Sequence, residues 1–317
     1  MSGALQLRLH FGERDRDGDG SLEDAVMDAC ARRGVEAAVL LRGVEGFGAK
    51  QLLRTDRLLS LSEDTPLLAV AVGGADVIEG LADEVREIAT EGLVVLEEVG
   101  GEGDGKGSEM VKATIWGARR GVSSPHLSAV AALKRRGAEA ATVLLGVDGV
   151  LDGERRRARF LAHNRGVPAL TVAMGERAAI AAALTEVDCA AHLVTFEGVE
   201  RKWRIAPPTL HGEAARVTLV TSEIAQCGAH PLYVELIHEL RRGGASGATA
   251  LRGVWGFRGD GAPHGDRVLA LRRDVPLIVE AVDAPDRAER WYELARSLAR
   301  DEDLVYSQPV GSVFTLT

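Results

Sequence analysis

The sequence predicts an α+β protein made of three tandem copies of a ferredoxin-like unit, in the order strand, helix, strand, strand, helix, strand. Two observations predict it. Three glycines, Gly34, Gly43 and Gly46, recur with the same spacing 103 positions later and again 107 positions after that. In addition, alternating apolar segments and segments of helical periodicity follow each other in the same order in every copy. We expect the copies to span residues 1–100, 109–203 and 214–312.

The first copy shows this order most clearly. Leucines that alternate with polar residues predict a strand over residues 5–11. Ser21 as N-cap and Gly34 as the stop signal predict the helix between them. The later elements are expected as a strand at 37–42, a glycine-rich turn with a long loop, a strand at 67–72, a helix at 75–89 and a strand at 93–99.

The other two copies repeat the pattern. The middle copy is expected to place strands at 111–116, 140–145, 169–173 and 193–199, and helices at 128–136 and 178–184. The last copy is expected to place strands at 217–221, 248–252, 277–281 and 304–308, and helices at 232–242 and 286–299. Gly100–Ser108 is rich in glycine and acids, and Arg204–Ala215 contains two prolines, so both are predicted to be flexible or extended connectors.

The copies are expected to close on one another. A ferredoxin-like unit leaves one face of its sheet without helices, and that face must be covered. A linear array would leave three such faces open, whereas three copies around a pseudo-threefold axis cover each other. We therefore expect an intramolecular pseudo-trimer, with its functional clefts where the copies meet.

Composition excludes several classes of function. A chain of 317 residues that is 46% apolar can bury an ample core. The formal charge of −9 and the 4% aromatic content argue against nucleic-acid binding. No apolar run approaches the ~18 residues of a membrane span, and the start of the chain lacks a signal-peptide profile. Three scattered cysteines are typical of reduced thiols in a cytoplasmic protein, so we expect a cytoplasmic location without membrane insertion.

Four segments carry a resemblance to a known family. They are Gly12-Glu13-Arg14-Asp15, Leu40–Ala49, Arg57–Pro66 and Gly92–Val99, with Pro231-Leu232-Tyr233 fitting the same pattern in the last copy. Together they resemble the PII-like family called domain of unknown function one-ninety, over nearly the whole chain as three tandem copies. That family is related to the PII nitrogen-regulatory signalling proteins, trimers of ferredoxin-like subunits that bind nucleotides in the clefts between subunits.

The resemblance implies a single-chain version of that trimer with three non-identical clefts. In PII proteins the second strand ends in Val-Lys-Gly-Phe-Gly, and Val44–Gly48 and Val254–Arg258 stand in the matching places. The glycine- and lysine-bearing loop that grips phosphates in PII is replaced here by Thr90-Glu91-Gly92, Ala190-Ala191-His192 and Asp301-Glu302-Asp303. The resemblance implies a small anionic effector, with nucleotides among the candidates, and a protein partner such as a membrane transporter or channel. We expect no cofactor.

Glycines and arginines near the ends of the second strands form the candidate ligand-binding set. Glycine lets the backbone approach a ligand, although it equally suits the turn that leaves the strand. Arginine can form forked hydrogen bonds to a carboxylate or phosphate, and it can equally pair with an acid of a neighbouring copy. The middle copy has Leu145 and Val150 instead of the arginine and phenylalanine, so we expect it to contribute least. The set is Arg42, Gly43, Gly46, Phe47, Gly48, Arg57, Arg159, Arg252, Gly253, Gly256, Phe257 and Arg267.

Metal-binding and catalytic functions have less support. The segment from Asp15 to Val26 follows the calcium-binding EF-hand pattern except at its last position, where valine replaces the glutamate that closes the site. A solvated loop leading into a helix is favoured over a weak cation site. A cation-binding protein like the trimeric CutA proteins would need clusters of His, Cys or Met, and an enzyme would need a pocket of shifted titrating groups. We expect neither a metal site nor a catalytic residue, and hence a non-enzymatic regulatory or sensor protein.

Overall fold

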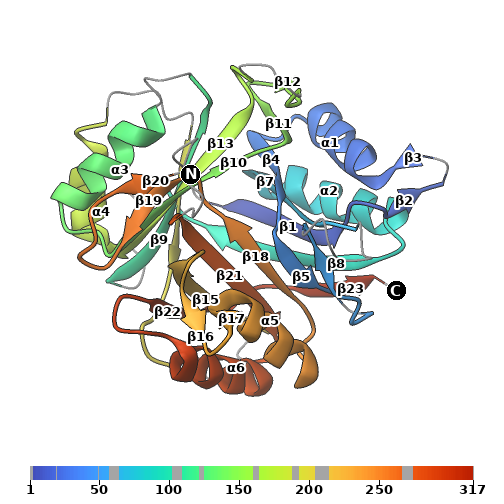
Figure 1. Ribbon diagram of the computed structural model, residues 1–317. Helices are drawn as coiled ribbons and strands as arrows, with labels where there is room; N and C mark the ends of the chain where they lie inside the picture. Colours follow the sequence, from blue (N-terminus) through green and yellow to red (C-terminus); the bar gives the residue numbers. More distant parts are fainter. Residues whose placement is uncertain are drawn as a thin grey trace.

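Three antiparallel sheets, each with two helices on its outer face, make up the fold of this computed structural model (Figure 1). The helices lie on the periphery of the molecule, and the sheets face one another between them. The structure describes residues 3–18, 20–48, 50–56, 64–101, 109–120, 125–159, 164–187, 193–203, 214–265 and 274–316. The connectors at 102–108 and 204–213 lie outside these ranges, so their expected flexibility stays a prediction.

The first third of the chain, residues 4–100, contains all six of the elements expected in it. Gly34 ends the first helix in the left-handed conformation, with φ of 69°. Ser21 precedes that helix as expected, but its side chain makes no capping hydrogen bond. The elements are β1 (Ala4–Gly12), α1 (Leu22–Arg33), β4 (Ala37–Arg42), β7 (Pro66–Gly74), α2 (Ala75–Ile88) and β8 (Gly92–Val99), with short strands β2 (Arg16–Asp17), β3 (Gly20–Ser21), β5 (Glu45–Phe47) and β6 (Arg54–Thr55).

The middle third (residues 109–203) and the last third (residues 214–316) follow the same order. The middle third has β9 (Met110–Ala118), α3 (Pro125–Arg135), β10 (Ala140–Leu145), β11 (Asp148–Leu151), β12 (Glu154–Arg155), β13 (Pro168–Glu176), α4 (Arg177–Leu184) and β14 (Leu193–Gly198). The last third has β15 (Ala214–Ser222), β16 (Gln226–Cys227), β17 (His230–Pro231), α5 (Leu232–Arg242), β18 (Ala248–Arg252), β19 (Trp255–Arg258), β20 (His264–Gly265), β21 (Pro276–Asp283), α6 (Pro285–Leu298), β22 (Leu304–Val310) and β23 (Val313–Leu316).

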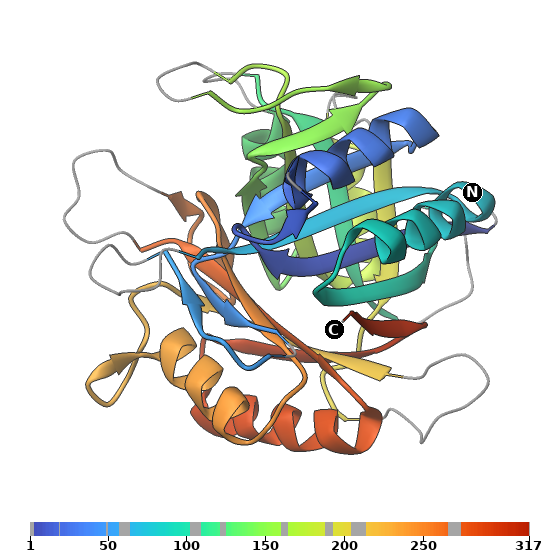
Figure 2. The same cartoon turned by 90° about the vertical axis from the view of Figure 1, so that its right-hand side faces the viewer.

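The segment after the second long strand differs from the expected turn and loop. In each third it forms a short strand that joins the sheet of another third. β5 pairs with β18 of the last third, β19 pairs with β10 of the middle third, and β11 pairs with β4 of the first third. The exchange therefore runs through all three thirds and returns to its start. The chain end adds one more link, because β23 pairs with β8 of the first third, as Figure 2 shows in dark red beside teal.

Apolar side chains of the exchanged strands pack in the cores of the thirds that these strands join. Phe47 packs in the helix-covered core of the last third, Phe257 in that of the middle third and Val150 in that of the first third. A further cluster lies between the inner sheet faces, and residues of all three thirds, among them Leu144 and Leu251, belong to it. This mixed α+β architecture is the fold class that the sequence predicts, and it is compatible with repeated ferredoxin-like units.

Charged residues are also buried between the sheets. Arg8 pairs with Glu280, and Arg216 pairs with Glu97, so each of these ion pairs joins the first third to the last. Burial alone would raise the pKa of Glu280, but Arg8, followed by Arg216, lowers that pKa to about 2. Three cations balance three carboxylates in this region: Arg8, Lys112 and Arg216 with Glu97, Glu197 and Glu280. Such groups are costly to leave unpaired, so they favour one specific arrangement of the three thirds.

Candidate functional site

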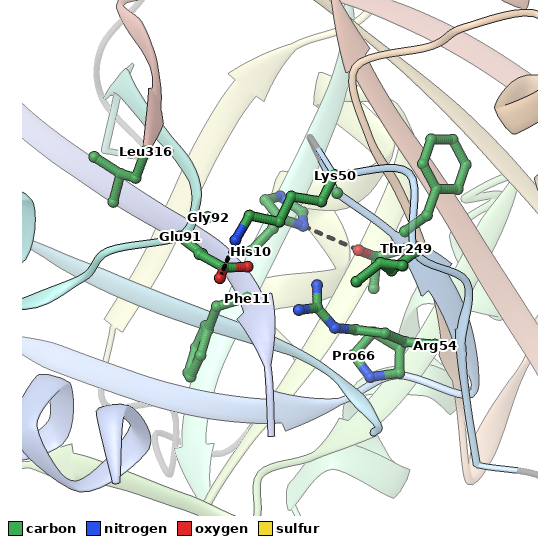
Figure 3. Close-up of a pocket in the computed structure, with 12 residues that line it drawn as sticks. His10, Phe11, Lys50, Arg54, Pro66, Glu91, Gly92, Thr249 and Leu316 are labelled. Carbon is green, nitrogen blue, oxygen red and sulfur yellow. Dashed lines mark hydrogen bonds and ion pairs between the residues drawn. The ribbon is translucent and has the colours of Figure 1, made fainter. Parts of the chain in front are cut away.

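A pocket lies beside the point where β5 of the first third joins β18 of the last third (Figure 3). Its cavity volume is about 20 Å³, and the space between its walls is about 450 Å³ when the open solvent at its mouth is counted. Most of its wall comes from the first third, while Thr249 on β18 and the chain end on β23 supply the rest. The lining residues are His10, Phe11, Phe47, Gly48, Lys50, Leu52, Arg54, Pro66, Glu91, Gly92, Thr249 and Leu316. We call it the effector pocket.

A glycine allows β5 to reach this place. A Cβ atom on Gly46 would lie 2.6 Å from the carbonyl oxygen of Ala248 in the neighbouring strand. At the equivalent Gly256 the corresponding separation, to the carbonyl oxygen of Ala141, would be only 2.0 Å. Both are shorter than any side chain tolerates, so the repeated glycine is needed for the strand exchange itself. The exchange then leaves Gly48 at the edge of the pocket.

His10 forms the inner wall of the effector pocket. Its ring Nδ1 lies 3.0 Å from the hydroxyl oxygen of Thr249, and its buried Nε2 has no hydrogen-bond partner in the part of the chain that the structure describes. Burial, followed by the nearby Arg8, lowers the pKa of His10 to about 3. The imidazole is therefore neutral at physiological pH, and Nε2 can donate or accept one hydrogen bond depending on the tautomer.

Two cationic side chains stand at the mouth and side of the pocket. Lys50 pairs with Glu91 across the mouth, and about half of the lysine side chain is exposed. Arg54 is 11% exposed and is held by Asp64 at 2.5 Å and by Asp15 at 3.2 Å. An exposed ion pair is worth roughly 0–1 kcal/mol, so Lys50 can change partners at little cost. Arg54 has a fixed position and supplies a positive wall.

The predicted ligand-binding residues do not all come together. Phe47 and Gly48 line the effector pocket, and Gly46 lies next to them in β5. Arg42 and Gly43 lie at the end of β4, where Arg42 pairs with Glu13 of its own third.

The remaining members lie elsewhere. Arg252 pairs with Asp56 of the first third at 3.1 Å and with Glu223 at 2.7 Å, and Gly253 follows it. Phe257, next to Gly256 in β19, is fully buried in the core of the middle third. Arg159 lines a separate groove beside α1. Arg57 and Arg267 lie outside the described residues.

Sequence reasoning missed the polar residues of the pocket. His10, Lys50 and Arg54 are absent from the predicted ligand-binding set, and Glu91 appears in the sequence analysis only as part of the segment that replaces the phosphate-gripping loop. A signal for His10 was present, because it alternates with the apolar residues of its strand and so points to the opposite face of the sheet. That face is interior only if the three sheets face one another.

A metal centre is not evident in the described residues. No three side chains of His, Cys, Asp or Glu come together there in a way that could hold a metal ion. In the EF-hand-like segment, Asp15 pairs with Arg54 and accepts a hydrogen bond from the Gly12 backbone, while Asp19 lies outside the described residues. Within the same ranges, the longest and most apolar helices fall short of what a membrane crossing requires.

Comparison with known proteins identifies two segments of the chain. The family model DUF190, described as "Uncharacterized ACR", matches residues 4–100 and 214–311, which are the first and last thirds. Among solved structures, an aspartate kinase from Synechocystis is 10% identical and aligns over 96% of this chain with a TM-score of 0.31. The chain spans 44% of the length of that kinase, and a likeness this weak carries no argument about fold or function.

Proposed function

The chain belongs to the DUF190 family, which is PII-like, and from this premise we propose that it is a regulatory or sensor protein built as a single-chain counterpart of a trimer. The circular exchange of β5, β19 and β11 supports the trimer-like arrangement, because each third completes the sheet of another. The shared inner cluster and the buried ion pairs between thirds support it as well. The proposal includes the cytoplasmic location that the cysteine pattern favours.

The effector pocket is the proposed binding site for a small anionic effector. The observation that carries this proposal is that Lys50, Arg54 and His10 line one pocket between two thirds, and that the buried Nε2 of His10 has no hydrogen-bond partner among the described residues. A carboxylate or phosphate group can accept hydrogen bonds from the lysine and arginine and one more from the imidazole. Glu91 occupies the place of a phosphate-gripping loop, so a small carboxylate or a single phosphate group suits the pocket better than a triphosphate.

Binding would act through the exchange of the Lys50 partner. An anion in the pocket competes with Glu91 for Lys50, and residues 50–53 move with the lysine. Gln51 of that segment donates a hydrogen bond to the carbonyl of Ala245 in the last third, so the movement alters a contact between thirds. Occupancy of the pocket would thereby present or withhold a surface for a protein partner, such as a transporter or channel.

Binding is favoured over catalysis at this site. A general base works best when its pKa lies near the operating pH. His10 has a pKa of about 3, so it is a weak base at neutral pH, and Arg54 is held by two carboxylates. We therefore propose a non-enzymatic role.

A ligand screen tests the proposed function. Carboxylic acids, inorganic phosphate and nucleotides are added to the full chain, and an effector is recognised because it raises the melting temperature. Lys50→Gln should weaken its binding about tenfold or more, since a charge-assisted hydrogen bond is worth about 1.5–3 kcal/mol. Glu91→Gln should strengthen it by removing the competing carboxylate. Lys202→Gln, an exposed lysine outside the pocket, is the matched control. The proposal fails if no anion stabilises the protein, or if Lys50→Gln binds as the wild type does.

A further inference from the structure

A wide groove rich in arginine lies beside β12 of the middle third and α1 of the first. Figure 1 shows these two elements near each other at the edge of the molecule. The cavity volume of the groove is about 840 Å³, and it opens broadly to solvent, unlike the effector pocket. Five of its nine lining residues are arginines, in a protein whose formal charge is −9. The lining residues are Asp24, Glu154, Arg155, Arg156, Arg157, Arg159, Asn164, Arg165 and Val167. We call it the arginine groove.

The inner arginines of the groove hold the structure together. Arg155 pairs with Asp24 at 2.5 Å and with Asp28 at 2.6 Å, both on α1, and with the buried Asp148 at 2.6 Å. Arg157 also pairs with Asp24, at 2.7 Å. These pairs join the middle third to the first, so the two arginines are not available to a ligand.

The outer arginines have a different environment. Arg159 and Arg165 are exposed, and within the described ranges neither has an ion-pair partner. The backbone N–H of Arg159 donates to the Asn164 side-chain oxygen at 2.7 Å, which keeps the two arginines on one rim of the groove. Among the described residues Arg156 pairs only with Glu154, and both side chains are more than half exposed, so this weak pair can open. Three guanidinium groups therefore face the open groove.

We propose that the arginine groove binds an acidic segment, rich in Asp and Glu, of a partner protein. Arginine forms forked, charge-assisted hydrogen bonds with carboxylates, and a local positive region on an acidic protein attracts such a segment selectively. The groove is too open to enclose a small anion, whereas an extended chain can contact several arginines along it. None of the described residues that line it is aromatic, and the formal charge of −9 argues against nucleic acid as its ligand.

The inference rests on the proposed function and supplies its partner-binding surface. β12 lies at one edge of the sheet that also contains β1, whose His10 lines the effector pocket. The groove and the pocket are thus separate sites on one continuous sheet. Changes in the effector pocket can reach the groove through β7, β4 and β11, which lie between them in that sheet.

Binding of a fluorescent peptide of eight glutamates to the full chain tests the inference by fluorescence anisotropy. The double variant Arg159→Gln/Arg165→Gln should weaken peptide binding more than tenfold, because two charge-assisted interactions are lost. The matched control, Arg16→Gln/Arg296→Gln, removes two exposed arginines outside the groove and should bind as the wild type does. Raising the salt concentration should weaken binding of the wild type much more than that of the double variant.

Other outcomes would overturn the inference. These are an absence of peptide binding at low salt, equal binding by the two double variants, or binding of tripolyphosphate but not of the peptide, which would assign the groove to a phosphate ligand. The Lys50→Gln variant separates the two sites. If it binds the peptide as the wild type does, the groove works independently of Lys50, and if in addition no anion of the ligand screen stabilises the wild-type chain, the groove stands and the proposed effector site falls.

Discussion

The Nδ1 of His10 on β1 and the hydroxyl oxygen of Thr249 on β18 lie 3.0 Å apart, although 239 positions separate them in the chain. This contact joins the first and last thirds at the wall of the effector pocket. The wall is therefore complete only when the two thirds are correctly placed. A ligand that contacts His10 is consequently sensitive to the relative position of the two thirds and can alter it.

The exchanged glycines should be intolerant of any side chain. Gly46→Ala and Gly256→Ala each place a Cβ within 2.6 Å of a carbonyl oxygen of another third. We expect each to lower the free energy of unfolding by roughly 1–3 kcal/mol or more, the usual cost of overpacking. Gly74→Ala, where a Cβ would have no atom within 4 Å, is the control and should change it by less than about 1 kcal/mol. Urea denaturation measures all three, and equal effects would contradict the role of the glycines.

The buried Arg216 should be essential to the assembly. It is fully buried and pairs with Glu97 and, at 3.4 Å, with Glu197. Arg216→Ala leaves two carboxylates buried without this partner, which typically costs about 3–5 kcal/mol of unfolding free energy. Arg242→Ala removes an exposed arginine that pairs with Glu239 and should cost less than about 1 kcal/mol. A stability of Arg216→Ala within 1 kcal/mol of the wild type would show that the central charges do not hold the thirds together.

Periodicity was enough to predict the long elements but not the exchanged strands. The eighteen predicted strands and helices all have counterparts, because each contains enough residues to show its period. β5, with three residues and a glycine in its middle, shows no period, and its partner β18 is in another third. Such pairing depends on how the thirds meet, which no local pattern contains. β23 was not predicted for the same reason, because its partner β8 belongs to the first third.

The candidate site was predictable only in part. Phe47 and Gly48 were found because the strand-end motif is repeated in the sequence. His10, Lys50 and Thr249 were missed because they come together only where the first and last thirds of the chain meet in space. Phe257 belongs to the same motif, yet it is buried in the core of the middle third. The repeated motif therefore indicates an exchanged strand and is not specific for a ligand-binding site.

Stability should decrease on acidification because of His10. Its pKa is about 3 in the folded protein and about 6.5 when unfolded, so the unfolded chain binds more protons below pH 6.5. The stability that the neutral ring provides is complete above pH 6.5 and is lost as the pH falls toward 3. Glu280 adds a second loss between about pH 4.5 and 2, because its folded pKa is depressed. His10→Gln should show a smaller fall in unfolding free energy between pH 7 and 5 than the wild type, by urea denaturation at each pH. If His10→Gln loses as much unfolding free energy between pH 7 and 5 as the wild type does, a group other than His10 causes the pH dependence.

The chain should hold one strong effector site, not three equal ones. The strand registers place Trp116 and Val220 at the positions equivalent to His10, since these residues pair with Leu170 and Ile278 as His10 pairs with Leu68. Neither an indole nor an isopropyl group provides an imidazole nitrogen that can either donate or accept a hydrogen bond. Calorimetry with an effector from the screen should therefore give a stoichiometry near one per chain.

The same titration distinguishes the site from its counterparts. His10→Ala should weaken binding about tenfold or more through loss of a hydrogen bond to a charged group. Val220→Ala, at the equivalent place in the last third, should leave the affinity as it is. Three equal sites per chain, or equal affinities in the two variants, would mean that the repeated architecture and not the His10 side chain determines where the effector binds.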